Sequence, residues 1–98
     1  MRTIVRTELA ETDFEAILAY LDEHSPAAAE RLATEIDETC RHLAAQPRMG
    51  RPRDDLSVGL RSIVVQKYLV FFRSTVDTLV VVRILHGARD QSAIDWEE

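Results

Sequence analysis

The sequence predicts an α+β fold, made of an N-terminal strand, an antiparallel helical hairpin and a C-terminal antiparallel sheet of three to four strands. Apolar residues recur at helical spacing between residues 8 and 45, which predicts two helices. Three runs rich in Val, Ile, Leu and Phe follow between residues 60 and 86 and predict strands. Since a chain of 98 residues has room for one hydrophobic core, we expect a single domain over residues 1–98.

The first 23 residues predict a strand and then a helix. Residues 2–6 consist of three β-branched residues with an arginine at each end, which favours a short edge strand. Thr7 is a suitable N-cap, and the acidic residues that follow it suit the positive end of a helix dipole. The helix is expected at about 8–23, with an apolar stripe made of Phe14, Ile17, Leu18 and Leu21.

A second helix is predicted directly after the first. Ser25 is a suitable N-cap, and Pro26 occupies the first helical position, where its missing N–H is harmless. The apolar stripe runs on to Ala45, and Pro47 ends it. The short link between the helices makes residues 8–45 an antiparallel hairpin.

The C-terminal half predicts a basic loop followed by a meander. Residues 46–59 contain two prolines and two glycines interspersed with Arg48, Arg51 and Arg53. Strands are expected at 60–65, 68–74 and 79–85, and their short connections favour an antiparallel meander over residues 60–86. An acidic tail follows at residues 90–98.

Two of these strands are apolar on both faces, at residues 69–72 and 79–82. Such strands lie centrally in a sheet that is covered on both sides. One helical hairpin covers one face only, so we expect an apolar groove on the other face, which the tail and Trp96 cover in part. A partner protein would fill the rest.

Charge is segregated along the chain. The formal net charge is −5. Residues 1–40 contain three basic and ten acidic residues, whereas residues 41–89 contain nine basic and three acidic ones. The acidic total therefore does not exclude a nucleic-acid-associated target, and the two halves predict two surfaces with different partners.

The composition excludes several other classes of protein. Cys40 is the only cysteine, so neither an internal disulfide nor a cysteine-based zinc site can form. The sequence begins without a secretory signal pattern, and no run approaches the roughly 18 apolar residues of a membrane span. We expect a cytoplasmic protein that does not interact with membranes.

Few residues could carry chemistry. His86 follows the last strand and has the titration range of a general acid, although closing the strand end with a backbone hydrogen bond is the more common role of such a histidine. Arg61, Arg73 and Arg83 lie one on each strand and could meet on one face as an anion site, or pair separately. His24 and His42 lack a second ligand at helical spacing, so no metal or other cofactor is expected.

Four short segments carry the most specific pattern in the chain: Pro47-Arg-Met-Gly-Arg51, Gly59-Leu-Arg-Ser62, Tyr68-Leu-Val-Phe-Phe-Arg73 and Arg83-Ile-Leu-His-Gly-Ala-Arg-Asp90. In order and spacing they resemble the ParE/RelE superfamily of type II toxin–antitoxin toxins, and the ParE branch more than the RelE branch. The resemblance covers nearly the whole chain. It implies a plasmid- or chromosome-encoded bacterial toxin that traps DNA gyrase on DNA, blocks replication and is held inactive in a hetero-oligomer with a ParD-type antitoxin.

Two sets of contact residues follow from this resemblance and from the charge pattern. The expected target-binding residues are Arg48, Arg51, Arg53, Arg61, Arg83, His86 and Arg89. The expected antitoxin-binding residues are Leu18, Leu21, Leu69, Phe71, Val81 and Trp96.

Two alternative functions remain open at this level. A RelE-type nuclease would cut messenger RNA on the ribosome with His86, Arg61 and Arg83, but the sequence offers no convincing base. A non-toxic binding module would instead pair with an antitoxin-like partner in a DNA-bound repressor complex. Induction of the chain in bacteria distinguishes the three functions. A gyrase inhibitor would arrest growth with DNA damage, a nuclease would arrest growth with loss of translation, and a binding module would not arrest growth.

Overall fold

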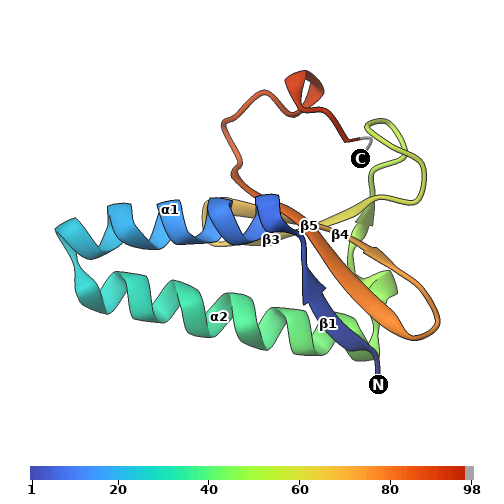
Figure 1. Cartoon of the computed structure of the whole chain (residues 1–98), viewed down its shortest axis with the longest axis horizontal. Coiled ribbons are helices and arrows are strands. Elements are labelled where there is room, and N and C mark those ends of the chain that lie inside the picture. Colours follow the sequence, from blue (N-terminus) through green and yellow to red (C-terminus); the bar gives the residue numbers. More distant parts are fainter. Residues whose placement is uncertain (97–98) are drawn as a thin grey trace.

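The computed structural model describes residues 1–96 of the chain, so the last two residues of the predicted tail lie outside the described residues. The elements in chain order are β1 (Thr3–Arg6), α1 (Glu8–His24), α2 (Pro26–Ala45), the short 3₁₀ helix η1 (Pro47–Met49), β2 (Arg51–Pro52), β3 (Arg61–Val65), β4 (Tyr68–Ser74), β5 (Thr78–His86) and the 3₁₀ helix η2 (Gln91–Ala93). Figure 1 shows the two helices side by side, with the sheet at one end and along one side of them.

The predicted helical hairpin is confirmed together with its caps. The Thr7 hydroxyl oxygen accepts a hydrogen bond from the Ala10 N–H at 3.1 Å, and the Thr7 hydroxyl donates to the Val82 carbonyl at 2.8 Å. Ser25 accepts from the Ala28 N–H at 3.2 Å and starts α2. Both helix starts are therefore fixed by short polar side chains that satisfy free amide groups of the first turn.

The α+β fold is confirmed, but the sheet has five strands and is mixed. Its order is β1-β5-β4-β3-β2, with β1 parallel to β5 and the other pairs antiparallel. The hairpin of β4 and β5 leaves one edge of β5 open, and β1 fills that edge. The two-residue β2 lies in the segment 46–59 that was expected to be loop, and its Pro52 is tolerated because β2 is an edge strand.

The larger core lies between the helical hairpin and one face of the sheet. Residues of both helices pack there against the alternate residues of β3, β4 and β5 that point toward them. The fully buried members of this core include Leu32, Ile36, Leu43, Val70, Phe72, Leu79 and Val81.

The opposite face of the sheet carries a second core, which corrects the expectation of an open apolar groove there. Phe71 and Leu85 are covered by Leu60 from the loop after β2 and by Trp96 from the tail. The Trp96 ring lies 4.6 Å from the Phe71 ring, and its Nε1–H donates to the Gln91 carbonyl at 3.0 Å. In Figure 1 the tail and this loop rise on the same side of the sheet. The chain therefore covers most of this face by itself.

One part of the second face stays open near β3. The Val64 side chain is 67% exposed, and Leu69 beside it is half-buried. These two residues are cross-strand partners and so share a face of the sheet.

Among the described residues, neither α1 nor α2 has the apolar composition that a membrane-spanning helix needs.

Candidate functional site

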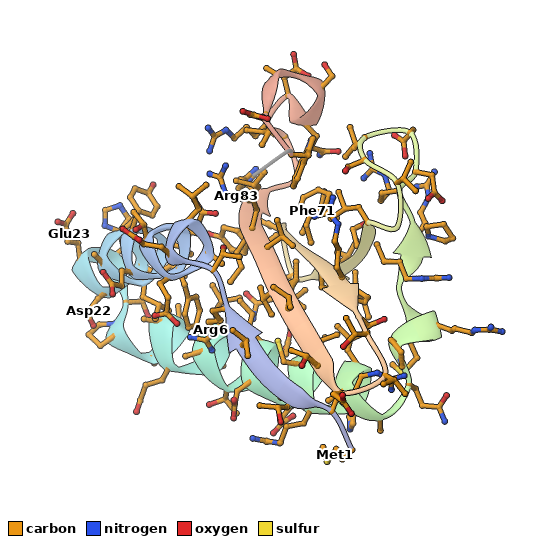
Figure 2. The ribbon with its side chains drawn as sticks, turned by 45° about the vertical axis from the view of Figure 1, so that its right-hand side comes forward. Met1, Arg6, Asp22, Glu23, Phe71 and Arg83 are labelled. Carbon is orange, nitrogen blue, oxygen red and sulfur yellow. The ribbon has the colours of Figure 1, made fainter. Side chains whose placement is uncertain are left out.

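Arg83, a predicted contact and nuclease residue, is held inside the fold. Its guanidinium donates two hydrogen bonds to the carboxylate of Asp13 on α1, at 2.7 and 2.9 Å. Both side chains are only 12% exposed, and the Ile84 N–H donates to the same carboxylate at 3.1 Å. Arg83 therefore acts first as a structural link between α1 and β5. Figure 2 labels the position of Arg83.

The three strand arginines do not meet on one face, so of the two alternatives that the sequence left open, an anion site or separate pairing, the structure shows separate pairing. Arg61 is the cross-strand partner of Phe72, which faces the helices, and its guanidinium donates to the Gly50 carbonyl at 2.7 Å. Arg73, the next residue after Phe72, points to the other face and donates to the Ser57 hydroxyl. Side chains alternate between the two faces along β4, so Arg73 lies on the face opposite to Phe72 and to its cross-strand partner Arg61.

The basic loop holds both exposed and engaged arginines. Arg48 and Arg51 are exposed, as is Arg89 in the loop after β5. Arg53 is engaged, because it pairs with Asp55, donates to the Gln91 side chain and lies 5.7 Å from the Phe71 ring. The hydrogen bond from Arg53 also lowers the pKa of the Asp55 carboxyl below its usual value. Arg48, Arg51 and Arg89 are therefore the accessible cations of the predicted set.

His86 lies in a groove of about 760 Å³ that sequence reasoning missed. Its ring packs edge-on against Tyr68, with 5.6 Å between ring centroids. Its Nδ1 accepts a hydrogen bond from the Ala88 N–H at 3.0 Å, so the neutral ring carries its proton on Nε2. The groove is lined by Ile17, Tyr20, Leu21, Ala28, Gln66, Lys67, Tyr68 and His86.

The hairpin turn between β3 and β4 forms one wall of this groove. Gln66 has a backbone φ of +56°, a left-handed conformation that is uncommon outside glycine. The Gly87 N–H donates to the Lys67 carbonyl at 2.9 Å and fixes the end of β5 to the same turn. The sequence indicates this turn, because only two polar residues separate the two apolar strand runs. The position of the turn beside the helices depends on how the sheet packs against them.

The predicted antitoxin-binding residues are dispersed, and half of them are unavailable. Phe71, Val81 and Trp96 are buried in the chain's own two cores, because the tail and the hairpin cover both faces. Leu21 lines the His86 groove, and Leu69 lines a separate hollow over β3. Leu18 lines a shallow, alanine-rich hollow between the helices. The structure therefore does not bring these six residues together.

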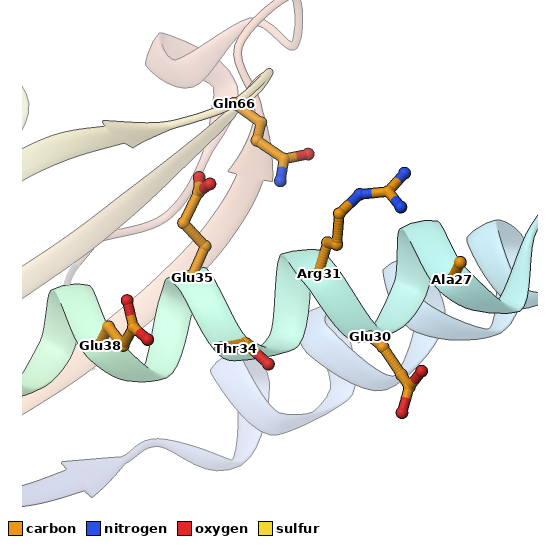
Figure 3. Close-up of a pocket in the computed structure, with 7 residues that line it drawn as sticks. All are labelled: Ala27, Glu30, Arg31, Thr34, Glu35, Glu38 and Gln66. Carbon is orange, nitrogen blue, oxygen red and sulfur yellow. The ribbon is translucent and has the colours of Figure 1, made fainter.

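A hollow along α2 is acidic (Figure 3). Glu35 and Gln66 point toward one another across it, while Glu30 and Thr34 point away from the turn. It contains none of the predicted site residues. Among residues 1–96, no three His, Cys, Asp or Glu side chains gather closely enough to hold a metal ion.

Comparison with known proteins agrees with this fold and with the sequence pattern. Residues 4–91 match the family described as the ParE toxin of the type II toxin–antitoxin system parDE. The chain belongs to the ParE toxin family. The predicted membership of the ParE/RelE superfamily, closer to the ParE branch, is confirmed.

Two relatives of this ParE-family chain from Caulobacter vibrioides are matched over almost their whole length. It is 30% identical over 94 residues to Toxin ParE3 of Caulobacter vibrioides, which covers 95% of this chain and 94% of that protein. It is 37% identical over 90 residues to Toxin RelE2 of the same species, covering 91% and 99%. A solved structure described as the chromosomal ParDE TA system from P. aeruginosa has the same fold, with a TM-score of 0.70, 22% identity, and coverage of 88% of this chain and 96% of that one.

Proposed function

We propose that this ParE-family toxin inhibits DNA gyrase by binding to the enzyme on DNA, without making or breaking a bond itself, and that a ParD-type antitoxin neutralises it. The observation that supports this proposal best is the family match over residues 4–91. The charge pattern agrees with it, since Arg48, Arg51 and Arg89 offer exposed cations for a target that carries phosphate.

The placement of the expected nuclease residues also favours inhibition by binding. Val65 pairs with Tyr68, and Tyr68 pairs with His86, so His86 lies level with the end of β3. Arg61 begins β3, which places it roughly 13 Å away along the strand direction at about 3.3 Å per residue. His86 and Arg61 therefore do not converge on one scissile phosphate.

The direct test is the supercoiling activity of purified gyrase with and without the purified chain. We expect the wild-type chain to block supercoiling and to accumulate cleaved DNA. Charge reversal of the exposed pair, Arg48→Glu with Arg51→Glu, should reduce inhibition at least about tenfold, because like charges then face the DNA. The matched control is Arg31→Glu, an exposed arginine on α2. Full inhibition by a folded double variant would refute the role of the loop.

A ribosome-dependent messenger RNA nuclease is the second candidate function. The observation that favours it is the groove in which His86, Tyr68 and Lys67 lie together. In this case induction of the chain would stop translation and leave cut transcripts, and Tyr68→Phe or His86→Ala would abolish both effects. Under gyrase inhibition, induction would instead cause filamentation with DNA damage. Normal growth on induction would favour the non-toxic repressor module.

A further inference from the structure

The His86 groove, which lies between the helical hairpin and the turn that joins β3 to β4, has an apolar floor. Ile17, Leu21 and Ala28 of the helices and Tyr68 of β4 line it and are half-buried. Ile17, Leu21 and Tyr68 also pack against the larger core, so the floor is continuous with the interior of the protein. Its volume of about 760 Å³ lies within the range of roughly 300–1,000 Å³ that is typical of small-molecule sites. The groove is therefore large enough for a small ligand with an apolar body.

The rim of the same groove carries hydrogen-bond donors. Lys67 is the only lysine of the chain, and within residues 1–96 its exposed ammonium group forms no ion pair. The neutral His86 ring donates through Nε2–H, since Nδ1 accepts from the Ala88 N–H, and no acceptor within the same residues meets this N–H. None of the residues that line the groove in this described part of the chain is acidic, although the helices beside it are rich in Asp and Glu. The rim therefore favours a ligand with an anionic group.

The sheet holds these donors in place before a ligand arrives. Tyr68 and His86 are cross-strand partners, and their rings lie edge-on with 5.6 Å between centroids. The Gly87 N–H donates to the Lys67 carbonyl at 2.9 Å and joins the end of β5 to the turn. Binding therefore costs little conformational entropy on this side of the groove, apart from the ordering of the Lys67 side chain.

We propose that the His86 groove binds a small aromatic carboxylate. The ring of the ligand would pack on the apolar floor beside Tyr68, and its carboxylate would accept hydrogen bonds from Nζ of Lys67 and Nε2 of His86. A nucleic acid fits less well, because among the lining residues within 1–96 only Lys67 is a permanent cation, whereas a phosphate backbone needs several.

This site goes beyond gyrase inhibition and does not rest on it. Arg51 pairs with Ser62 near the start of β3, whereas the groove lies beside the turn that follows Val65. Failure of the carboxylate to bind would therefore leave the proposed contact between the exposed arginines and the target intact. Failure to inhibit gyrase would equally leave the groove as a binding site.

A nuclear magnetic resonance titration of the isotope-labelled full chain with hydrocinnamate tests the proposal. We expect saturable shifts of the backbone amides of Gln66, Lys67 and Ala88, with a dissociation constant of about 0.1–1 mM. The neutral analogue hydrocinnamamide should bind at least about fivefold more weakly, because it offers no charge to Lys67. Equal binding of the two compounds would show that the groove selects only apolar surface and would overturn the proposal. Shifts that do not saturate would overturn it as well.

The Lys67→Met variant tests the anionic end of the site, because it keeps the length of the side chain and removes its charge. Its affinity for hydrocinnamate should fall at least about fivefold, while its affinity for the amide should not change. Arg31→Met is the matched control, since Arg31 is an exposed cation of α2 outside this groove, and it should bind both compounds as the wild-type chain does. Wild-type affinity of Lys67→Met for hydrocinnamate would overturn the proposal. Tighter binding of uridine monophosphate than of hydrocinnamate by the wild-type chain would identify an RNA site instead and would overturn it too.

Discussion

Asp13 and Arg83 join the first helix to the last strand across 70 positions of the sequence. The carboxylate of Asp13 accepts both prongs of the guanidinium and the N–H of Ile84, so one side chain serves three donors. The pair is largely shielded from water, with each side chain 12% exposed. The pair therefore ties α1 to β5.

Removal of Asp13 should therefore destabilise the fold strongly. Asp13→Ala leaves the Arg83 charge partly buried with its main partner gone, and we expect the free energy of unfolding to fall by about 3 kcal/mol. Urea denaturation followed by circular dichroism measures this loss. The matched control is Asp37→Ala, which breaks the exposed Asp37–Arg41 pair on α2 and should cost about 0.5 kcal/mol or less. Equal losses in the two variants would contradict a structural role for the Asp13–Arg83 pair.

Gly50 should not tolerate a side chain. A Cβ at this position would lie 2.3 Å from Cζ of the fully buried Phe72 ring, which the core holds in place. Gly50→Ala should lower the free energy of unfolding by about 1–3 kcal/mol. Gly87→Ala serves as the control, since its Cβ would meet only the Lys67 carbonyl at 3.3 Å. A shift in the urea midpoint that is no larger at Gly50 would show that the Phe72 ring can move.

Gln66→Gly should stabilise the protein. Gln66 adopts a left-handed φ of +56°, which costs a residue with a side chain about 1–2 kcal/mol, and glycine avoids this cost. Glycine also gives the unfolded chain more conformational entropy, which offsets part of the gain in stability. The net gain in the free energy of unfolding should be up to about 1 kcal/mol. Lys67→Gly, next to it and outside the left-handed region, should instead destabilise. Thermal unfolding of both variants distinguishes backbone strain at Gln66 from a general effect of glycine in this turn.

Stability should decline at alkaline pH because of Cys40. Burial raises the pKa of the Cys40 thiol, while Arg6 opposes this effect. Above about pH 8.5 the thiol ionises in the unfolded chain and stays protonated in the folded one, so unfolding releases a proton. The free energy of unfolding should fall with rising pH, by at most about 1.4 kcal/mol per pH unit. Cys40→Ala should flatten this slope between pH 8 and 10, and an unchanged slope would assign it to other groups.

Trp96 should anchor the tail over the second core. Trp96→Ala removes the contact with Phe71 and exposes that core, which should cost about 3 kcal/mol in urea denaturation. Trp96→Phe keeps a ring on Phe71 and loses only the hydrogen bond to Gln91, so its cost should be about 1 kcal/mol. If Trp96→Ala unfolds at the wild-type urea concentration, the tail contributes nothing to the stability of the sheet.

Sequence patterns predicted the local elements because local physics decides them. Thr7 and Ser25 cap the helices through contacts three residues away, and the apolar period fixes which side of each helix is buried. The strand runs at β3, β4 and β5 were found for the same reason. The parallel pairing of β1 with β5 was missed, since it joins residues about 75 positions apart and leaves no local signal.

The sequence by itself determined the fold class, the order of elements, the charge segregation and the family to which the chain belongs. Tertiary structure decided which arginines are available. Arg83 pairs with Asp13 of α1, and Arg53 donates to Gln91 in addition to its local partner Asp55, while Arg48 and Arg51 stay exposed. It also decided that the tail covers the second face and that the open surface narrows to the edge at Val64. The physical reason is that side-chain availability depends on partners brought together from distant parts of the chain, whereas a pattern of residue types records only what lies within a few positions.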